Sequence, residues 1–156
     1  MPKALMFVGA LMATLGAAVA AWRRDRRMGS AFVNTLVNPL LLRRGLAGGT
    51  HSEIGPLEHV GRKSGIRRLT PVHPEATPDG FRVMVPLGER SEWARNVLTA
   101  GHCRVQLHGQ VYDLTDPQLV PPQEVSGLPR LVRRVTGALG FRYLTMRTVG
   151  LKPGTL

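Results

Sequence analysis

Residues 57–73 read LEHVGRKSGIRRLTPVH, two short apolar runs joined by a basic turn with glycine at both ends. Residues 57–60 predict a strand and residues 68–73 predict the strand that returns beside it, because alternate residues of a strand fall on one face. Gly61 and Gly65 allow the chain to reverse between the two strands. The stretch therefore predicts a β-hairpin whose tip is positively charged.

Short apolar runs separated by glycine and proline continue beyond this hairpin, which is typical of a small antiparallel β-fold. Ser91 precedes a helical pattern that runs to about Ala100 and stops at Gly101, since serine caps helix starts and glycine ends helices. The other expected elements are a turn at 79–80, strands at 81–85, 103–107 and 110–115, a tight turn at 108–109, a sheet extension at 119–120, and a last helix at 125–139 interrupted near Gly127 and Pro129. The order of three strands, a helix and two strands between terminal helices predicts an α+β fold, a small antiparallel barrel.

Residues 4–22 carry no charge and are followed by Arg23, Arg24, Arg26 and Arg27. A helix of this length spans roughly 28 Å at ~1.5 Å per residue, close to the thickness of a bilayer core. Basic clusters beside such helices stay on the cytoplasmic side. We therefore expect residues 1–22 to form a transmembrane anchor with the folded domain on the cytoplasmic side; the alternatives are a cleaved signal peptide and a helix packed on the domain.

The segment from residue 23 to residue 50 is a second unit, basic at both ends and apolar between Ala31 and Leu42. Its apolar spacing is close to 3.6 residues, which predicts an amphipathic helix kinked at Pro39. This helix would lie on the membrane surface or cover the core of the domain formed by residues 51–156.

The composition limits the partners of the chain. Lysine and arginine number 21 against 10 acidic residues, for a formal net charge of +11. Such a charge suits nucleic acid, anionic lipid or a polyanionic small molecule. Aromatic residues make up only 5% of the chain, so few stacking platforms exist and no nucleic acid is expected. Cys103 is the one cysteine, and the five histidines show no ligand spacing, so neither a disulfide within the chain nor a metal site is expected.

The basic turn is the sharpest candidate for chemistry. Arg62, Lys63 and Arg68, with Arg67 and the hydroxyl of Ser64, gather on one short hairpin. Backbone amides, guanidinium groups and an ammonium together can cradle a phosphate. The alternative is a solvated basic hairpin without a ligand.

A second motif lies between residues 87 and 97. Gly88 follows a strand and Ser91 opens a helix, and helix N-termini attract anions. Trp93 and Asn96 are three residues apart and share one helix face. Trp93 either stacks on a planar ring or packs in the core.

Three pieces of sequence taken together resemble the deazaflavin-dependent nitroreductase family. They are GRKSG at 61–65 followed by RLTPV at 68–72, WARNV at 93–97 followed by Ala100 and Gly101, and RTV at 147–149. The resemblance covers residues 57–120 and, more weakly, the C-terminal tail. It implies a split β-barrel, similar to FMN-binding split barrels, that binds reduced coenzyme F420.

The resemblance also implies roles for individual residues. Arg62, Lys63, Ser64 and Arg68 would hold the phosphate and polyglutamate tail of the cofactor. Pro71 and Val72 would lie under the deazaflavin ring, and the loop with Gly88 and Arg90 would approach the phosphate or the ring. Trp93 and Asn96 would fix that loop or line the pocket. The proton would come from Tyr143, Ser91 or solvent.

The expected reaction is transfer of a hydride to an electron-poor acceptor such as a quinone or a nitroaromatic compound. Membrane association through the N-terminus is also a trait of this family. Two other functions stay open: a non-enzymatic basic membrane protein that binds anionic lipid, and a split barrel that uses FMN or haem. The oligomeric state, a dimer included, is open as well.

Overall fold

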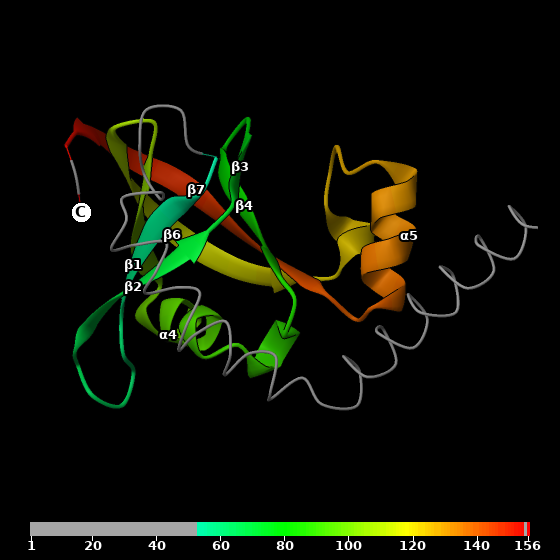
Figure 1. The fold of residues 1–156 in the computed structure, drawn as a ribbon, viewed down its shortest axis with the longest axis horizontal. Coiled ribbons are helices and arrows are strands. Elements are labelled where there is room, and N and C mark those ends of the chain that lie inside the picture. Colours follow the sequence, from blue (N-terminus) through cyan, green and yellow to red (C-terminus); the bar gives the residue numbers. More distant parts are fainter. Residues whose placement is uncertain (1–52, 155) are drawn as a thin grey trace, which may run out of the picture.

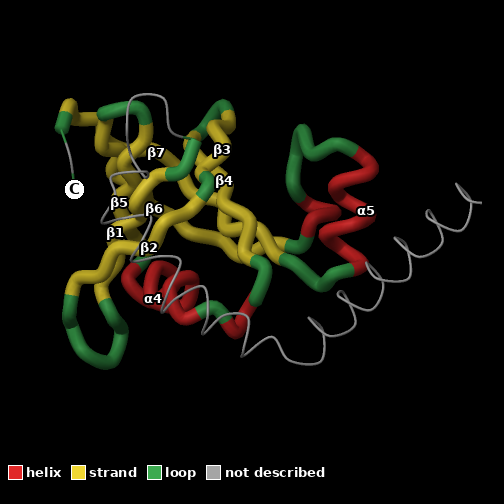
Figure 2. The backbone as a smooth tube through the Cα atoms, in the orientation of Figure 1, coloured by secondary structure: helices red, strands yellow, loops and turns green. Residues whose placement is uncertain are grey.

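The computed structural model describes residues 53–154 and residue 156 (Figures 1 and 2). Within them the chain forms one antiparallel sheet of seven strands and two α-helices. The strands are β1 (Gly55–Val60), β2 (Arg67–Val72), β3 (Pro74–Thr77), β4 (Gly80–Val85), β5 (His102–Leu107), β6 (Gln110–Val120) and β7 (Arg142–Pro153). The helices are α4 (Glu92–Ala100) and α5 (Arg130–Ala138), with the short 3-10 helices η2 (Gly88–Arg90) and η3 (Pro122–Glu124).

The topology shows that the sheet is curled. The strand order is β2-β1-β5-β6-β7-β4-β3, so β2 and β3 are its two edges. These edge strands are consecutive in the chain and only His73 separates them. A sheet whose opposite edges are joined by one residue has to bend until those edges approach each other. The described residues therefore form an antiparallel half-barrel, which confirms the predicted α+β class.

The main core joins residues of several strands of this sheet to helix α4. Leu57, Val83, Val105 and Leu144 come from four different strands and are at most 2% exposed. Removing such side chains from water stabilises the fold by about 1.5–3 kcal/mol each. Ala94 and Val97 of α4, both fully buried, close this cluster from one side.

Helix α4 has the predicted boundaries. Ser91 occupies its N-cap position, and Gly101 ends it with a left-handed backbone (φ 73°). The side chain of Ser91 makes no capping hydrogen bond, so its contribution is backbone geometry and burial rather than the expected hydroxyl cap.

The C-terminal third differs from the sequence-based prediction. The helix expected at 125–139 begins only at Arg130, after η3 and the turn at 126–127. The chain then continues into β7, a strand of 12 residues that was not predicted and that pairs with both β4 and β6. Tyr143 and Leu144 are buried on opposite faces of β7, so the polar-apolar alternation that reveals a half-buried strand is missing. The helix predicted in this region is therefore present from Arg130 to Ala138, but its predicted start was wrong and the strand that follows it was missed.

The predicted sheet extension at 119–120 belongs to β6 itself, which continues past a bulge between Thr115 and Gln118.

The part of the chain that the structure describes contains no helix with the length and apolarity needed to cross a bilayer. The anchor predicted at 1–22 and the segment at 23–50 lie outside the described residues.

Candidate functional site

The basic turn between β1 and β2 is closed by its own backbone. The amide of Gly61 donates to the carbonyl of Ile66 at 2.9 Å, and the amide of Gly65 donates to the carbonyl of Gly61 at 2.8 Å. Gly65 adopts a left-handed backbone (φ 66°), and a Cβ on Gly61 would lie 2.5 Å from Oγ of Ser64. The shape of the turn therefore requires glycine at position 65, and Gly61 leaves room for the hydroxyl of Ser64.

The hydrogen bonds within the turn limit the number of backbone amides that could bind an anion. The amide of Ser64 also donates to the carbonyl of Gly61, at 3.2 Å, and the amide of Ile66 approaches Oγ of Ser64 at 3.4 Å. Amides that donate within the turn are not aimed at a ligand. An anion would therefore be held chiefly by side chains rather than by the backbone groups that the glycines were expected to expose.

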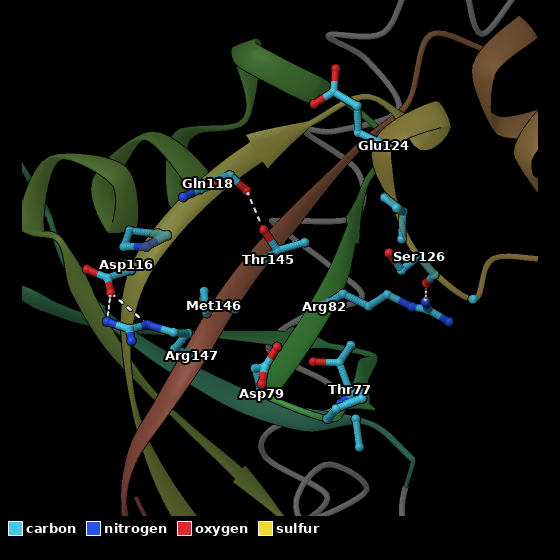
Figure 3. Close-up of a pocket in the computed structure, with 15 residues that line it drawn as sticks. Thr77, Asp79, Arg82, Asp116, Gln118, Glu124, Ser126, Thr145, Met146 and Arg147 are labelled. Atoms are coloured by element: carbon cyan, nitrogen blue, oxygen red, sulfur yellow. Dashed lines mark hydrogen bonds and ion pairs between the residues drawn. The ribbon is translucent and has the colours of Figure 1, made fainter.

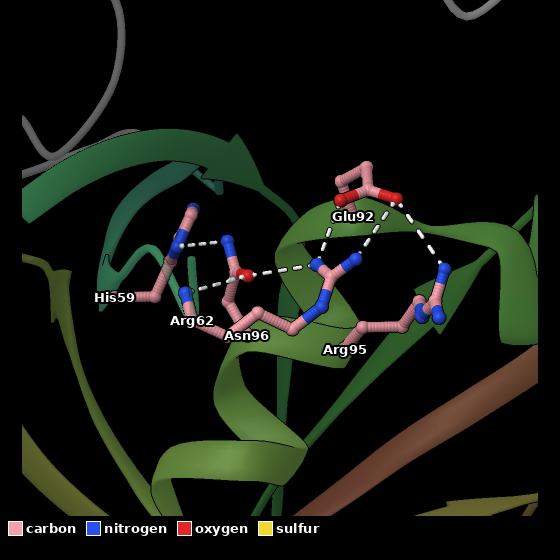
Figure 4. Close-up of polar contacts among 5 residues, drawn as sticks. All are labelled: His59, Arg62, Glu92, Arg95 and Asn96. Atoms are coloured by element: carbon pink, nitrogen blue, oxygen red, sulfur yellow. Dashed lines mark hydrogen bonds and ion pairs between the residues drawn. The ribbon is translucent and has the colours of Figure 1, made fainter. Parts of the chain in front are cut away.

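Arg62 ties this turn to helix α4 (Figure 4). Its amide donates to Oδ1 of Asn96 at 3.2 Å, and its Nη1 donates to the same oxygen at 3.1 Å. Its guanidinium also forms an ion pair with Glu92, with Nη1 at 2.7 Å from Oε2. Asn96 is only 6% exposed, so the turn rests on a buried amide that belongs to the neighbouring helix.

His59 completes this polar network on its inner side. Oδ1 of Asn96 accepts from Arg62, so its Nδ2 points to Nδ1 of His59, 3.2 Å away. An amide nitrogen only donates, and Nδ1 therefore accepts, which leaves the proton on Nε2 to be donated to Oγ1 of Thr70 at 3.0 Å. Burial, and secondarily the charge of Arg68, lower the pKa of His59, which keeps this ring neutral near pH 7.

The remaining cations of the turn have no such partners. Lys63, Arg67 and Arg68 are exposed, and none forms an ion pair with another described residue. Elsewhere in the described residues most arginines of the sheet are paired with acids, as Arg82 is with Glu75. Three uncompensated positive charges therefore gather at one rigidly held hairpin.

Glu92 is an acidic residue that interacts with the cations of the turn. It pairs with Arg62 and, at 3.5 Å, with Arg95. The hydrogen bond from Arg62 holds the pKa of Glu92 below its usual value, so its carboxylate stays ionised. Glu92 is thus shared by Arg62 and Arg95, and it attracts Lys63 without forming an ion pair with it.

The sequence analysis identified the cations of this site but not two residues of the polar network that holds the turn. Asn96 was singled out as a residue of the helix face, but Glu92 and His59 were not assigned to the site. The only local signals were the position of Glu92 directly after Ser91 and the position of His59 two residues before the turn.

The other predicted cofactor-binding residues lie on β2, η2 and α4, outside the basic turn. Pro71 and Val72 are at the far end of β2 from the turn, and Val72 is buried in the core. Gly88 and Ser91 are buried where η2 leads into α4, while Arg90 is exposed between them. Trp93, half-buried, packs against the core cluster.

Tyr143 is not brought together with the turn. It pairs with Met84 of β4 and Val120 of β6, is 1% exposed, and packs with Val125 and Leu128. Ser91, the other expected proton donor, is 2% exposed. Both hydroxyl-bearing residues therefore lie below the surface of the described fold.

A separate open cavity of about 1000 Å³ lies between the β3–β4 hairpin, the bulge of β6, β7 and the loop after η3 (Figure 3). Its charged residues are largely paired. Arg82 donates hydrogen bonds to the carboxylate of Glu75 and to the carbonyl of Ser126, and Arg147 forms an ion pair with Asp116. None of the predicted site residues lines this cavity. Within the described part of the chain, no group of three or more His, Cys, Asp or Glu side chains is arranged to hold a metal ion.

Comparisons with known proteins give only remote likenesses. No protein-family model matches the chain, and no curated protein matches it. Among solved structures, the chain is similar to an F420 reductase (11% identity, TM-score 0.46, covering 70% of this chain and 94% of the other). It is also similar to the heme storage protein HutZ from Vibrio cholerae (12%, 0.45, 72% and 91%) and to a FAD-binding protein from Mesorhizobium loti (17%, 0.44, 72% and 89%).

Likenesses this remote carry no functional conclusion, which has to come from the residues themselves. What the described residues define is an antiparallel half-barrel with an uncompensated cationic turn, held in place by a buried histidine–asparagine–arginine network.

Proposed function

We propose that this protein is an oxidoreductase that binds coenzyme F420 at the β1–β2 turn and passes a hydride from the reduced deazaflavin to an electron-poor acceptor. The proposal rests on one observation: Lys63, Arg67 and Arg68 are exposed and form no ion pairs among the described residues. Because Arg62 and Asn96 already fix the turn, little ordering would oppose the binding of an anion there.

The residues of the turn then divide into two roles. Arg62 is a positioning residue, since its guanidinium is occupied by Glu92 and Asn96. Lys63, Arg68 and the neighbouring Arg67 would bind the phosphate and the tail carboxylates, with the hydroxyl of Ser64 beside them. A polyanionic cofactor fits three free cations better than FMN does, because FMN carries a single phosphate.

The chemistry of hydride transfer would be supplied by the deazaflavin when it is bound. The chain would orient the ring through Pro71, Val72 and the loop with Gly88 and Arg90, with Trp93 at its base. Ser91 and Tyr143 are buried, so solvent is the better source for the proton that the acceptor takes up. A quinone or a nitroaromatic compound has the electron-poor character that such a reaction needs.

A fluorescence titration of the full-length chain with F420 and with FMN, at low and high salt, tests this proposal. The double variant Lys63→Ala/Arg68→Ala should weaken F420 binding by about tenfold per cation, since hydrogen bonds to charged groups contribute about 1.5–3 kcal/mol each. The matched control Arg130→Ala/Arg134→Ala removes the same charge from α5 and should leave the affinity unchanged.

Each other result points to a different function. Equal and salt-insensitive binding of FMN would assign the barrel to FMN rather than F420. Binding of haem alone would assign it to haem. Binding of no cofactor, together with release from anionic vesicles when Lys63 and Arg68 are replaced, would leave a basic lipid-binding protein without an enzymatic role.

A further inference from the structure

Helix α5 has polar residues on its inner side and exposed apolar residues on its outer side. It lies at the end of the molecule opposite the β1–β2 turn (Figure 1). Thr136 is its one buried residue, and the half-buried Arg133 also faces the body of the protein. By contrast, Leu131, Val132 and Val135 are exposed by 72%, 40% and 48%. A helix that is solvated on its outer side has the reverse arrangement.

Contacts on the inner side hold α5 in this orientation. Nη2 of Arg133 donates to the carbonyls of Val125 and Leu128, each at 3.3 Å. Thr136 is 6% exposed and lies on the same inner side. Leu128 and Val125 themselves are buried against Tyr143 beneath the helix. The outward direction of Leu131 and Val135 is therefore set by several contacts.

The charges of α5 indicate what covers its apolar face. Arg130 and Arg134 are exposed and, among the described residues, form no ion pair. They are four residues apart, so they lie one above the other along a flank of that face. The helix RLVRRVTGA contains no acidic residue. An apolar stripe flanked by unpaired arginines is complementary to an anionic lipid surface, where apolar side chains enter the acyl boundary and guanidinium groups reach the phosphates.

We propose that the outer face of α5 docks on an anionic phospholipid membrane, with Leu131, Val132 and Val135 inserted and Arg130 and Arg134 at the headgroups. This contact does not depend on the proposed cofactor site. It would hold the half-barrel with the β1–β2 turn directed away from the lipid, since the two lie at opposite ends of the sheet (Figure 1).

The test uses the full-length chain in vesicles, because only a position-specific signal separates α5 from any other membrane contact. A single fluorophore is attached to Leu131→Cys, Val135→Cys or, as a matched control, Val149→Cys, an apolar position of β7 that is 66% exposed. Burial raises the pKa of the native Cys103 thiol to about 12, so it will not compete for the label at neutral pH. Vesicles contain either neutral phosphatidylcholine alone or a mixture with phosphatidylglycerol, and both carry a quencher on the acyl chains.

We expect the acyl-chain quencher to reach the labels at 131 and 135 in anionic vesicles, and to reach them far less in neutral vesicles or in the control at 149. Replacing Arg130 and Arg134 by Gln should lower the ratio of docked to undocked helix by roughly fivefold per arginine. Replacing Arg95 and Lys152 by Gln removes the same net charge elsewhere and should leave that ratio unchanged.

Two results would overturn the proposal. If lipid quenching at 131 and 135 equals that at 149 in both kinds of vesicle, the face is covered by a second copy or another segment of the chain, or stays in water. If quenching is strong but identical in neutral and anionic vesicles and in the Arg130→Gln/Arg134→Gln variant, the assignment to anionic lipid is wrong.

Discussion

The two helices of the half-barrel are attached to the sheet in opposite ways. Helix α4 turns apolar residues inward, Ala94 and Val97, and buries one amide, Asn96, to hold the basic turn. Helix α5 turns Arg133 and Thr136 inward and leaves leucine and valine outside. What each helix leaves exposed indicates its partner: free cations beside α4 suit an anion, and a free apolar face on α5 suits an apolar phase.

The largest effect should come from the apolar groups beneath each helix. Leu57 is fully buried in the main core, so Leu57→Ala should lower the free energy of unfolding by about 3–5 kcal/mol and act on the whole sheet. Leu128 belongs to the small cluster under α5, where Leu128→Ala should cost about 2 kcal/mol and act locally. Urea unfolding measures the first effect, and hydrogen exchange of the α5 amides measures the second.

The comparison would fail if Leu128→Ala accelerated exchange equally in α4 and α5. That result would mean that both helices belong to a single cooperative unit, whatever their different attachments.

A second contrast concerns the buried polar groups of the two helices. Asn96→Leu would leave the amide of Arg62 and the ring of His59 without their partner, at a cost of about 1–3 kcal/mol for buried unsatisfied groups. Thr136→Val removes only a hydroxyl that donates to a carbonyl four residues earlier in the same helix, so less than about 1 kcal/mol is expected. Thermal unfolding of both variants gives the comparison directly, and equal losses would contradict the special role of Asn96.

The same contrast explains what the sequence predicted well. Gly61, Gly65, Ser91 and Gly101 are local signals, since each specifies the backbone of its own neighbourhood, and the first hairpin and α4 were predicted from them. Strand β7 was missed because both of its faces are buried near Tyr143 and Leu144, which removes the alternation. Pairing with β4 and β6, rather than any local pattern, places it in the sheet.

The candidate site, like the fold, was predicted only where its signals are local in the sequence. The cluster of cations is visible in a few consecutive residues. The partner of Arg62 is not, because Glu92 lies 30 residues further along and only the folded sheet brings them together. Nor does the sequence show that the amides of the turn are used internally, since that depends on the left-handed backbone of Gly65.

A third difference between the region around α4 and the region around α5 is the dependence of their stability on pH. The pKa of His59 is lowered in the folded protein by burial and then by Arg68. The unfolded chain therefore binds a proton more readily, and stability that is present above the ordinary histidine pKa of 6.5 is lost as the pH falls below it. His59→Gln should flatten this part of the profile, measured by urea unfolding between about pH 8 and about pH 5.

Hydrogen exchange separates this effect from general acid unfolding. Protection of α4 and the turn should decrease first as the pH falls, while α5, which carries no histidine or acid, should follow only with global unfolding. A wild-type profile identical to that of His59→Gln would remove histidine from the explanation.

The smallest expected effect is the most specific to the proposed anion site. Glu92 is exposed, so Glu92→Gln removes a surface ion pair and should change the free energy of unfolding by less than about 1 kcal/mol. The same change removes an acid that attracts Lys63, and it frees Arg62 from its ion pair. Affinity for F420 should therefore rise by about two- to threefold, more at low salt than at high salt. Glu124→Gln, an exposed acid of η3 at the end of the molecule near α5, removes the same charge and should leave the affinity unchanged. If both substitutions raise the affinity equally, the net charge of the protein attracts the cofactor; if only Glu92→Gln does, the anion binds at the turn.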